Sequence, residues 1–224
     1  TKVIIRSKFA IFRFINRSKR AMLRFVKFRF DGNPNRWLFP FPLKKKEFFG
    51  IELAMSESVL EPRPETELLV EMVLTIAPKN ATLLDLGTGS GAIALAIAKE
   101  RPDIKVSASD LSTSALEIAR KNARSLNLNM TFFHSNWYQS LPHSKWDFLV
   151  SNPPYISEND PHLDALKKEP IEALVSGTDG LDAIRQIVSG SSDFLNPKGH
   201  LLIEHGFDQS HAVSSCLLYT SPSP

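Results

Sequence analysis

One segment near the middle of the chain restricts the fold more than any other. Leu-Leu-Asp-Leu at 83–86 precedes the glycine-rich run Gly87-Thr88-Gly89-Ser90-Gly91, and the apolar residues 92–98 follow it. This pattern is typical of a buried strand, a tight turn and an apolar helix. Glycine permits the turn and lets backbone N–H groups approach a ligand closely. The segment therefore predicts the first βα unit of a nucleotide-binding α/β domain.

A carboxylate lies where such a unit requires one. Residues 104–109 predict a second strand, and Asp110 ends it. An acidic residue in this place accepts hydrogen bonds from ribose hydroxyls, which strengthens an otherwise weak glycine signal. The spacing Gly-x-Gly-x-Gly differs from the dinucleotide pattern, and the sequence has no Gly-x-x-x-x-Gly-Lys run for a nucleoside triphosphate.

The run Asn152-Pro153-Pro154-Tyr155 directly follows a short apolar stretch. An amide or ring-amino nitrogen is a poor nucleophile, so a catalyst must accept hydrogen bonds from its N–H groups. The Asn152 side-chain carbonyl is one acceptor, and the carbonyl of Pro153 is a rigid second one. The ring of Tyr155 is suited to stack on the planar group. Taken alone, the run also fits an ordinary Asn-Pro turn.

At this point the chain resembles the S-adenosylmethionine-dependent methyltransferases that act on planar nitrogens. Three further segments narrow the resemblance: Glu-Pro-Arg-Pro-Glu-Thr-Glu at 61–67, Glu-Pro-Ile-Glu-Ala-Leu at 169–174, and Leu-Ile-Glu-His-Gly at 202–206. In this order they are similar to the release factor glutamine methyltransferase family. The resemblance runs from about Lys46 to about Val213.

The resemblance implies a class I, Rossmann-like α/β fold, with a mainly parallel sheet, helices on both faces and the final strands lacking. It also implies S-adenosylmethionine as the cofactor and the Gly-Gly-Gln loop of a peptide chain release factor as the partner. It assigns catalysis to Asn152, Pro153 and Tyr155, and substrate binding to these residues and Pro154. The cofactor residues that it implies are Gly87, Thr88, Gly89, Ser90, Gly91, Asp110, Asn136, Trp137 and Asn152.

Asn136 departs from the family pattern, which commonly has Asp before this Trp. If the side chain accepts a hydrogen bond from the adenine amino group, the Asn carbonyl replaces a carboxylate and loses its charge assistance. We expect a modest effect on the affinity for the cofactor.

The predicted chemistry uses neither a metal nor a covalent intermediate. The methyl group is already activated on sulfur, so catalysis consists mostly of alignment in a closed site. The single Cys216 has no second cysteine to join it in a metal site, and the six His residues are scattered along the sequence. We therefore expect no bound metal ion.

Positive charge is concentrated at the start of the chain. Residues 1–30 hold ten of the 27 Lys and Arg and none of the 24 Asp and Glu, so the remainder is acidic and unsuited to general nucleic-acid binding. This basic arm, residues 1–34, also contains many Phe residues. Three interpretations are open: the arm contacts RNA, it is a mitochondrial targeting peptide, or it lies outside the native reading frame. No stretch has the length of a membrane span or a signal peptide. A cytoplasmic location is expected, or the mitochondrial matrix if the arm is a transit peptide.

Three further domain boundaries are expected. Residues 35–60 read as an extended hairpin left from an N-terminal substrate-recognition domain, residues 61–213 as the methyltransferase domain, and residues 214–224 as an irregular tail. Because two further strands normally follow residues 199–205 in this class, we expect an incomplete sheet with an exposed apolar edge. Ser112, Thr113 and Ser114 are candidate caps for a helix that runs to about Leu126, and Ser114 and Glu117 have capping-box spacing. Residues 156–178 form a long connection suited to shaping the target pocket.

Three functions remain open from the sequence. The first is methylation of a release factor glutamine. The second is N-methylation of adenine or guanine in nucleic acid, since a flipped base also offers a planar amino group. The third is a non-catalytic scaffold that binds the cofactor.

Overall fold

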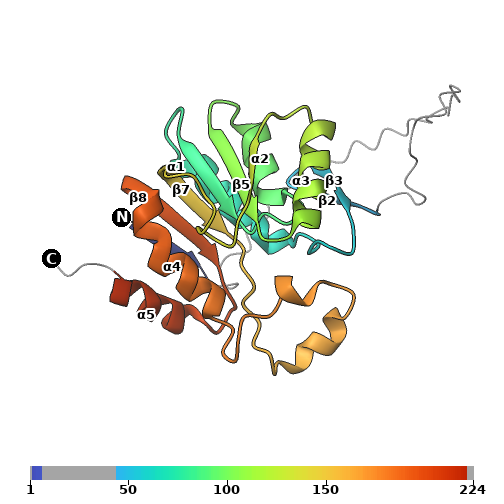
Figure 1. The fold of residues 1–224 in the computed structure, drawn as a ribbon, viewed down its shortest axis with the longest axis vertical. Helices are drawn as coiled ribbons and strands as arrows, with labels where there is room; N and C mark the ends of the chain where they lie inside the picture. Colours follow the sequence, from blue (N-terminus) through green and yellow to red (C-terminus); the bar gives the residue numbers. More distant parts are fainter. Residues whose placement is uncertain (1, 7–43, 221–224) are drawn as a thin grey trace, which may run out of the picture. The chain divides into compact units, whose positions relative to one another are not determined.

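The structure is a computed structural model that describes residues 2–6 and 44–220, with side chains described for residues 44–217. Most of the predicted basic arm lies outside the described residues. Six strands form one sheet in the order β1-β8-β7-β4-β5-β6, and every pair of neighbours is parallel (Figure 1). The strands are β1 (Lys2–Arg6), β4 (Thr82–Leu86), β5 (Lys105–Asp110), β6 (Thr131–His134), β7 (Trp146–Ser151) and β8 (Leu195–Glu204).

Helices cover both faces of this sheet, as expected. Successive strand residues point to opposite faces, so Leu83 joins one buried cluster and Leu84 the other. The first cluster contains side chains of α1 (Glu67–Ile76), α2 (Ala92–Glu100) and α3 (Thr113–Ser125). The second contains side chains of α4 (Asp182–Phe194) and α5 (Ser210–Thr220). The parallel sheet is therefore buried on both sides, which explains its apolar strands.

The strand order brings the predicted site residues to one place. From β4 the chain continues outward through β5 and β6 in one direction, whereas β7 and β8 extend the sheet in the other. In open α/β sheets, ligands bind at the carboxyl ends of the strands where the order reverses. The glycine turn after β4 thus lies between Asp110, at the end of β5, and Asn152, just after β7.

The predicted hairpin is present as β2 (Lys44–Phe48) and β3 (Ile51–Met55), paired antiparallel. Phe49 and Gly50 join the strands with φ angles of 46° and 71°, and this pair of positive values is typical of a type I′ turn. The hairpin is not a separate body, because Phe48 and Leu53 belong to the same buried cluster as α1–α3.

Asn122, on α3, also ties this hairpin to the domain. The buried Asn122 amide accepts from the backbone N–H of Ala54 at 2.8 Å and donates to its carbonyl at 3.0 Å. It also donates to the carbonyl of Ser90 at 2.9 Å. One side chain therefore connects the hairpin, α3 and the glycine turn.

The structure corrects two expectations, one about the edge of the sheet and one about the tail of the chain. The outer edge of β8 is not open, because β1 pairs with it from Lys2 opposite His200 to Arg6 opposite Glu204. Residues 210–220 form helix α5 rather than an irregular tail beginning at 214. The fully buried Val213 anchors that helix in the second cluster, so tertiary packing outweighs the weak local signal.

The start of α3 also differs in detail. Ser112, one of the three predicted caps, is the N-cap, and its hydroxyl accepts from the N–H of Ala115 at 3.2 Å. The predicted capping box from Ser114 to Glu117 is wrong, because Ser114 lies inside the helix. Short 3₁₀ helices complete the described chain: η1 (Pro64–Thr66), η2 (Pro161–Leu166) and η3 (Ile171–Ala173). The last two lie in the long connection between β7 and α4.

Candidate active site

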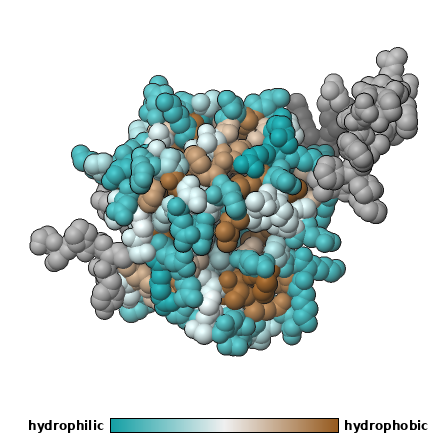
Figure 2. All heavy atoms as spheres, in the orientation of Figure 1, coloured by the Kyte–Doolittle hydropathy of each residue, from teal (hydrophilic) through white to brown (hydrophobic). Residues whose placement is uncertain are grey.

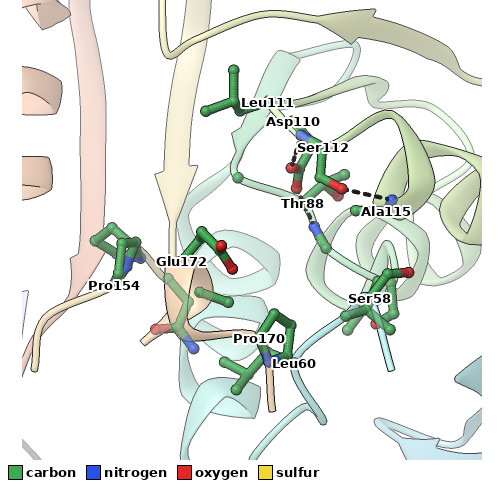
Figure 3. A pocket seen from close by; sticks show the side chains of 18 of the residues that line it. Ser58, Leu60, Thr88, Asp110, Leu111, Ser112, Ala115, Pro154, Pro170 and Glu172 are labelled. Carbon is green, nitrogen blue, oxygen red and sulfur yellow. Dashed lines mark hydrogen bonds between the residues drawn. The ribbon is translucent and has the colours of Figure 1, made fainter. Parts of the chain in front are cut away.

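A cavity of about 500 Å³ opens at the carboxyl ends of the central strands (Figure 3). Its walls come from the glycine turn, the ends of β5 and β6, the Asn-Pro-Pro run, and the segments before α1 and around η3. The lining residues are Ser58, Val59, Leu60, Pro62, Thr66, Gly87, Thr88, Gly89, Ser90, Ala92, Ile93, Asp110, Leu111, Ser112, Ser114, Ala115, Ser135, Asn136, Trp137, Asn152, Pro153, Pro154, Pro170, Glu172 and Ala173.

The glycine turn uses its three glycines in different ways. Gly87, Gly89 and Gly91 all have positive φ, at 72°, 56° and 86°. A Cβ built on Gly89 meets no atom within 4 Å, so this residue faces open space in the cavity. Gly91 does not line the cavity, and a Cβ there lies 2.8 Å from Leu95 Cδ1. Gly89 therefore leaves room for a ligand, whereas Gly91 allows α2 to pack closely.

Asp110 lies beside this turn and supports it. Its Oδ2 accepts from the backbone N–H of Gly89 at 2.8 Å, and its Oδ1 accepts from that of Ser112 at 2.9 Å. Burial raises the pKa of Asp110 above the usual value, although these two N–H groups oppose the shift. Its carboxylate lines the cavity across from Pro170 and Glu172 (Figure 3). This position suits an acceptor for ligand hydroxyls.

Asp85 stabilises the glycine turn through a hydrogen bond on the side away from the cavity. It is fully buried, and its Oδ2 accepts a hydrogen bond from the Thr88 hydroxyl at 2.7 Å. Burial raises the pKa of Asp85 to about 7, because removal from water disfavours the charged form. Asp85 does not line the cavity, so its contact with Thr88 shapes the turn rather than the ligand surface.

The loop after β6 places an aromatic ring in the cavity. Trp137 has a positive φ of 46°, and its Cζ3 lies 3.5 Å from a Cβ built on Gly87. The buried Ser135 fixes this loop, since its hydroxyl donates to the Trp137 carbonyl at 3.0 Å and accepts from the Ser140 N–H at 3.0 Å. Asn136 lines the cavity beside Trp137. Both predicted adenine contacts thus lie at the cavity.

Three of the four residues in the Asn-Pro-Pro-Tyr run also line the cavity: Asn152, Pro153 and Pro154. The Asn152 amide nitrogen donates to the Thr66 hydroxyl at 3.0 Å. Tyr155 does not line the cavity: its hydroxyl donates to Glu204 at 3.2 Å, and its ring packs against the second buried cluster. Burial, followed by the charge of Glu204, raises the pKa of Tyr155. The predicted stacking of Tyr155 on the target stays a prediction.

Two segments of the cavity wall are joined by an ion pair. The Arg63 guanidinium contacts the Glu169 carboxylate, and both side chains are partly buried. Arg63 is also the N-cap of η1, so the pair links the entry to α1 with the segment leading to η3. The contacts of Arg63 organise this entry, and the residue does not line the cavity.

Sequence reasoning missed several lining residues. Thr66, Leu111 and Glu172 belong to the cavity wall, yet none was assigned to the site. The resemblance included the segments around Thr66 and Glu172, which was the available signal. Around η3, Ile171 is 52% exposed, and apolar side chains gather on the face over the connection between β7 and α4 (Figure 2).

Within residues 2–6 and 44–220, no group of three or more His, Cys, Asp or Glu side chains is arranged to hold a metal ion. In the same part of the chain, no helix has the length and apolarity needed to cross a membrane.

Two solved methyltransferase structures share this fold. A methyltransferase from Pyrococcus furiosus matches with a TM-score of 0.59 at 18% identity, covering 78% of this chain and 80% of the other. Ribosomal protein L11 methylase from Lactobacillus delbrueckii subsp. bulgaricus matches with a TM-score of 0.55 at 20% identity, covering 72% of each chain. At these identities the likeness establishes the Rossmann-like methyltransferase fold.

Sequence comparison identifies the family. The model for the methyltransferase small domain matches residues 63–206. The release factor glutamine methyltransferase of Neisseria gonorrhoeae is 47% identical over 198 residues, which is 87% of this chain and 71% of the relative. The enzyme of the same name from Coxiella burnetii is 44% identical over 202 residues, or 89% of this chain and 72% of the relative. This chain therefore belongs to the release factor glutamine methyltransferase family.

Proposed function

We infer that this protein transfers a methyl group from S-adenosylmethionine to the side-chain amide nitrogen (N5) of the glutamine in the Gly-Gly-Gln motif of peptide chain release factors, modulating translation termination. One observation carries this inference: the glycine turn, Asp110 and Asn152-Pro153 line a single cavity. The residues proposed to hold the cofactor and the acceptors proposed for an amide nitrogen therefore share one cavity.

The residues present fit the proposed cofactor. The open space at Gly89 admits a ligand against the backbone, and Asp110 offers a carboxylate beside it. Trp137 and Asn136 would offer a ring face and an amide to the adenine, and Gly87–Ser90 would hold the methionine part. S-adenosylmethionine supplies an activated methyl group on a sulfonium sulfur.

The chain's own residues then hold the target amide. The two N–H groups of the target would donate to the Asn152 side-chain carbonyl and the Pro153 backbone carbonyl, which would orient the nitrogen for methyl transfer. The rigid Pro153-Pro154 backbone fixes this direction. The displaced amide proton leaves to solvent during or after transfer, so no strong base is required.

The long connection between β7 and α4 supports a protein substrate. It carries the exposed Ile171 beside Pro170 and Glu172, which line the cavity. An apolar rim beside the cavity suits a folded partner that presents a loop. We assign residues 61–213 to the catalytic domain. We also propose a cytoplasmic location, where translation termination supplies this substrate.

The test is methyl transfer to defined acceptors. The protein is incubated with S-adenosylmethionine and either a release factor or RNA, and mass spectrometry locates the added methyl group. We expect one methyl on the Gly-Gly-Gln glutamine. Methylation of RNA alone would refute the inference and favour nucleobase methylation, and cofactor binding without transfer to either acceptor would favour a scaffold.

A substitution assigns the activity to the site. Asn152→Ala is expected to abolish transfer and to leave the affinity for S-adenosylhomocysteine largely intact. Asn159→Ala is the matched control, because Asn159 is an exposed residue in the connection after β7 and lies outside the cavity wall. Equal loss in both variants would show that Asn152 has no specific role.

A further inference from the structure

The contact between Asn152 and Thr66 joins two parts of the chain that lie 86 residues apart. The Asn152 Nδ2 donates to the Thr66 Oγ1 at 3.0 Å, and both residues line the cavity. Among the described residues, Oδ1 of Asn152 accepts no hydrogen bond. The amide oxygen is thus available to a ligand, while the amide nitrogen is occupied.

The orientation of this amide decides what it offers the substrate. A side-chain amide has an acceptor on one side and two donors on the other, and a half-turn about its last torsion exchanges them. The proposed target is itself an N–H donor, so it needs the oxygen. With the nitrogen towards the target, two donors would face each other and the target would lose an acceptor.

Thr66 is well placed to fix the orientation. It is only 3% exposed, and its backbone N–H donates to the Arg63 carbonyl at 3.0 Å in the turn of η1. The ion pair of Arg63 with Glu169 holds one side of this turn. On the other side, the Glu67 carboxylate accepts from the backbone N–H of Phe49 at 2.8 Å. The hydroxyl therefore belongs to a restrained segment.

We propose that Thr66 is a positioning residue for methyl transfer, which holds the Asn152 amide with its oxygen towards the target nitrogen. This role rests on the proposed function of the Asn152 site. Thr66 itself needs no contact with the reacting atoms. Its hydroxyl acts by accepting from the amide nitrogen, which restrains the Asn152 side chain and leaves the amide oxygen for the target.

Two pairs of variants separate the hydroxyl from the volume of the side chain. Thr66→Val replaces the hydroxyl by a methyl group of similar size, so it is compared with the unsubstituted protein. Thr66→Ser and Thr66→Ala both lack the γ-methyl group and differ from each other by one oxygen. The second pair keeps the test valid if Thr66→Val fails to fold.

The measured quantities are kcat with a release factor, KM for the release factor, the dissociation constant of S-adenosylhomocysteine, and Tm. Loss of the hydroxyl is expected to lower kcat about tenfold within each pair, the effect of one buried hydrogen bond on the transition state. The dissociation constant should change less than about twofold, because Thr66 makes no bond to the glycine turn. Thr66→Ser should retain most of the activity.

Each outcome decides a different point. Equal kcat for Thr66→Ser and Thr66→Ala, or for Thr66→Val and the unsubstituted protein, would overturn the positioning role. A fall in kcat that only follows Tm and cofactor affinity would also overturn it in favour of a structural role. Failure of the unsubstituted protein to methylate a release factor would instead refute the proposed function.

Discussion

Three glycines with positive φ angles, two in the glycine turn and one in the hairpin, permit a sharp test of what the glycine turn does. Gly89→Ala places a methyl group in the empty part of the cavity, and Gly91→Ala directs one against Leu95 and Ala119. Gly50→Ala is the matched control: Gly50 has a φ of 71°, no atom within 4 Å of a built Cβ, and a position in the hairpin turn. The three variants share backbone strain and differ in what the methyl group meets.

The expected losses follow from these surroundings. Alanine in a left-handed conformation costs about 1–2 kcal/mol, so this loss of stability is expected in all three variants. For Gly91→Ala, contacts of 2.8 Å to Leu95 Cδ1 and 3.3 Å to Ala119 Cβ add overpacking. That term is about 1–3 kcal/mol. Each kcal/mol lowers Tm by about 2–4 °C in a domain of this size.

Affinity for the cofactor should rank the variants differently. Gly89→Ala is expected to weaken binding of S-adenosylhomocysteine at least about tenfold, equivalent to about 1.4 kcal/mol, because the methyl group occupies space proposed for the ligand. Gly50→Ala should bind like the unsubstituted protein. Thermal melts give the stability, and isothermal calorimetry gives the affinity. If Gly89→Ala binds as tightly as Gly50→Ala, the glycine turn does not hold the cofactor.

Two further predictions concern stability. Burial raises the pKa of Asp85 from 3.8 to about 7, so the folded protein binds more protons than the unfolded chain between these values, and stability falls as pH rises. Between pH 5 and 8 this contribution is about 3 kcal/mol, and denaturant titrations of Asp85→Asn should show a correspondingly weaker pH dependence; parallel profiles would contradict the assignment. Asn122→Ala leaves the buried partners at Ala54 and Ser90 unpaired and should lower the free energy of unfolding by about 2–4 kcal/mol. The exposed Arg124→Ala on the same helix should change it by less than about 0.5 kcal/mol, and equal losses would contradict the bridging role of Asn122.

Local patterns were sufficient to predict the centre of the fold. The glycine turn and the strand ending at Asp110 follow short-range rules, so they predicted a βα unit and the edge of the sheet where a ligand binds. The structure brings Asp110, Trp137 and Asn152 to one cavity, as the sequence implied. Their roles in binding and catalysis remain proposals.

Short-range sequence rules could not predict contacts between segments that lie far apart in the chain. The bond from Asn152 to Thr66 spans 86 residues, and the pair of Arg63 with Glu169 spans 106. Each depends on how several elements pack, which hydrophobic periodicity does not specify. Helix α5 was missed for a similar reason, because its formation depends on burial of Val213 against α4 and the sheet rather than on a strong local signal.

Asn122 gives the hairpin a mechanical connection to the cavity. Its side-chain amide makes hydrogen bonds to the backbone of Ala54 in the hairpin and to the carbonyl of Ser90 in the glycine turn. A displacement of β2 and β3 would therefore act on the turn through the hydrogen bonds of Asn122. A force applied to the hairpin at Lys44 would act on the proposed cofactor loop through Asn122, so strain in the hairpin and occupancy of that loop should influence each other.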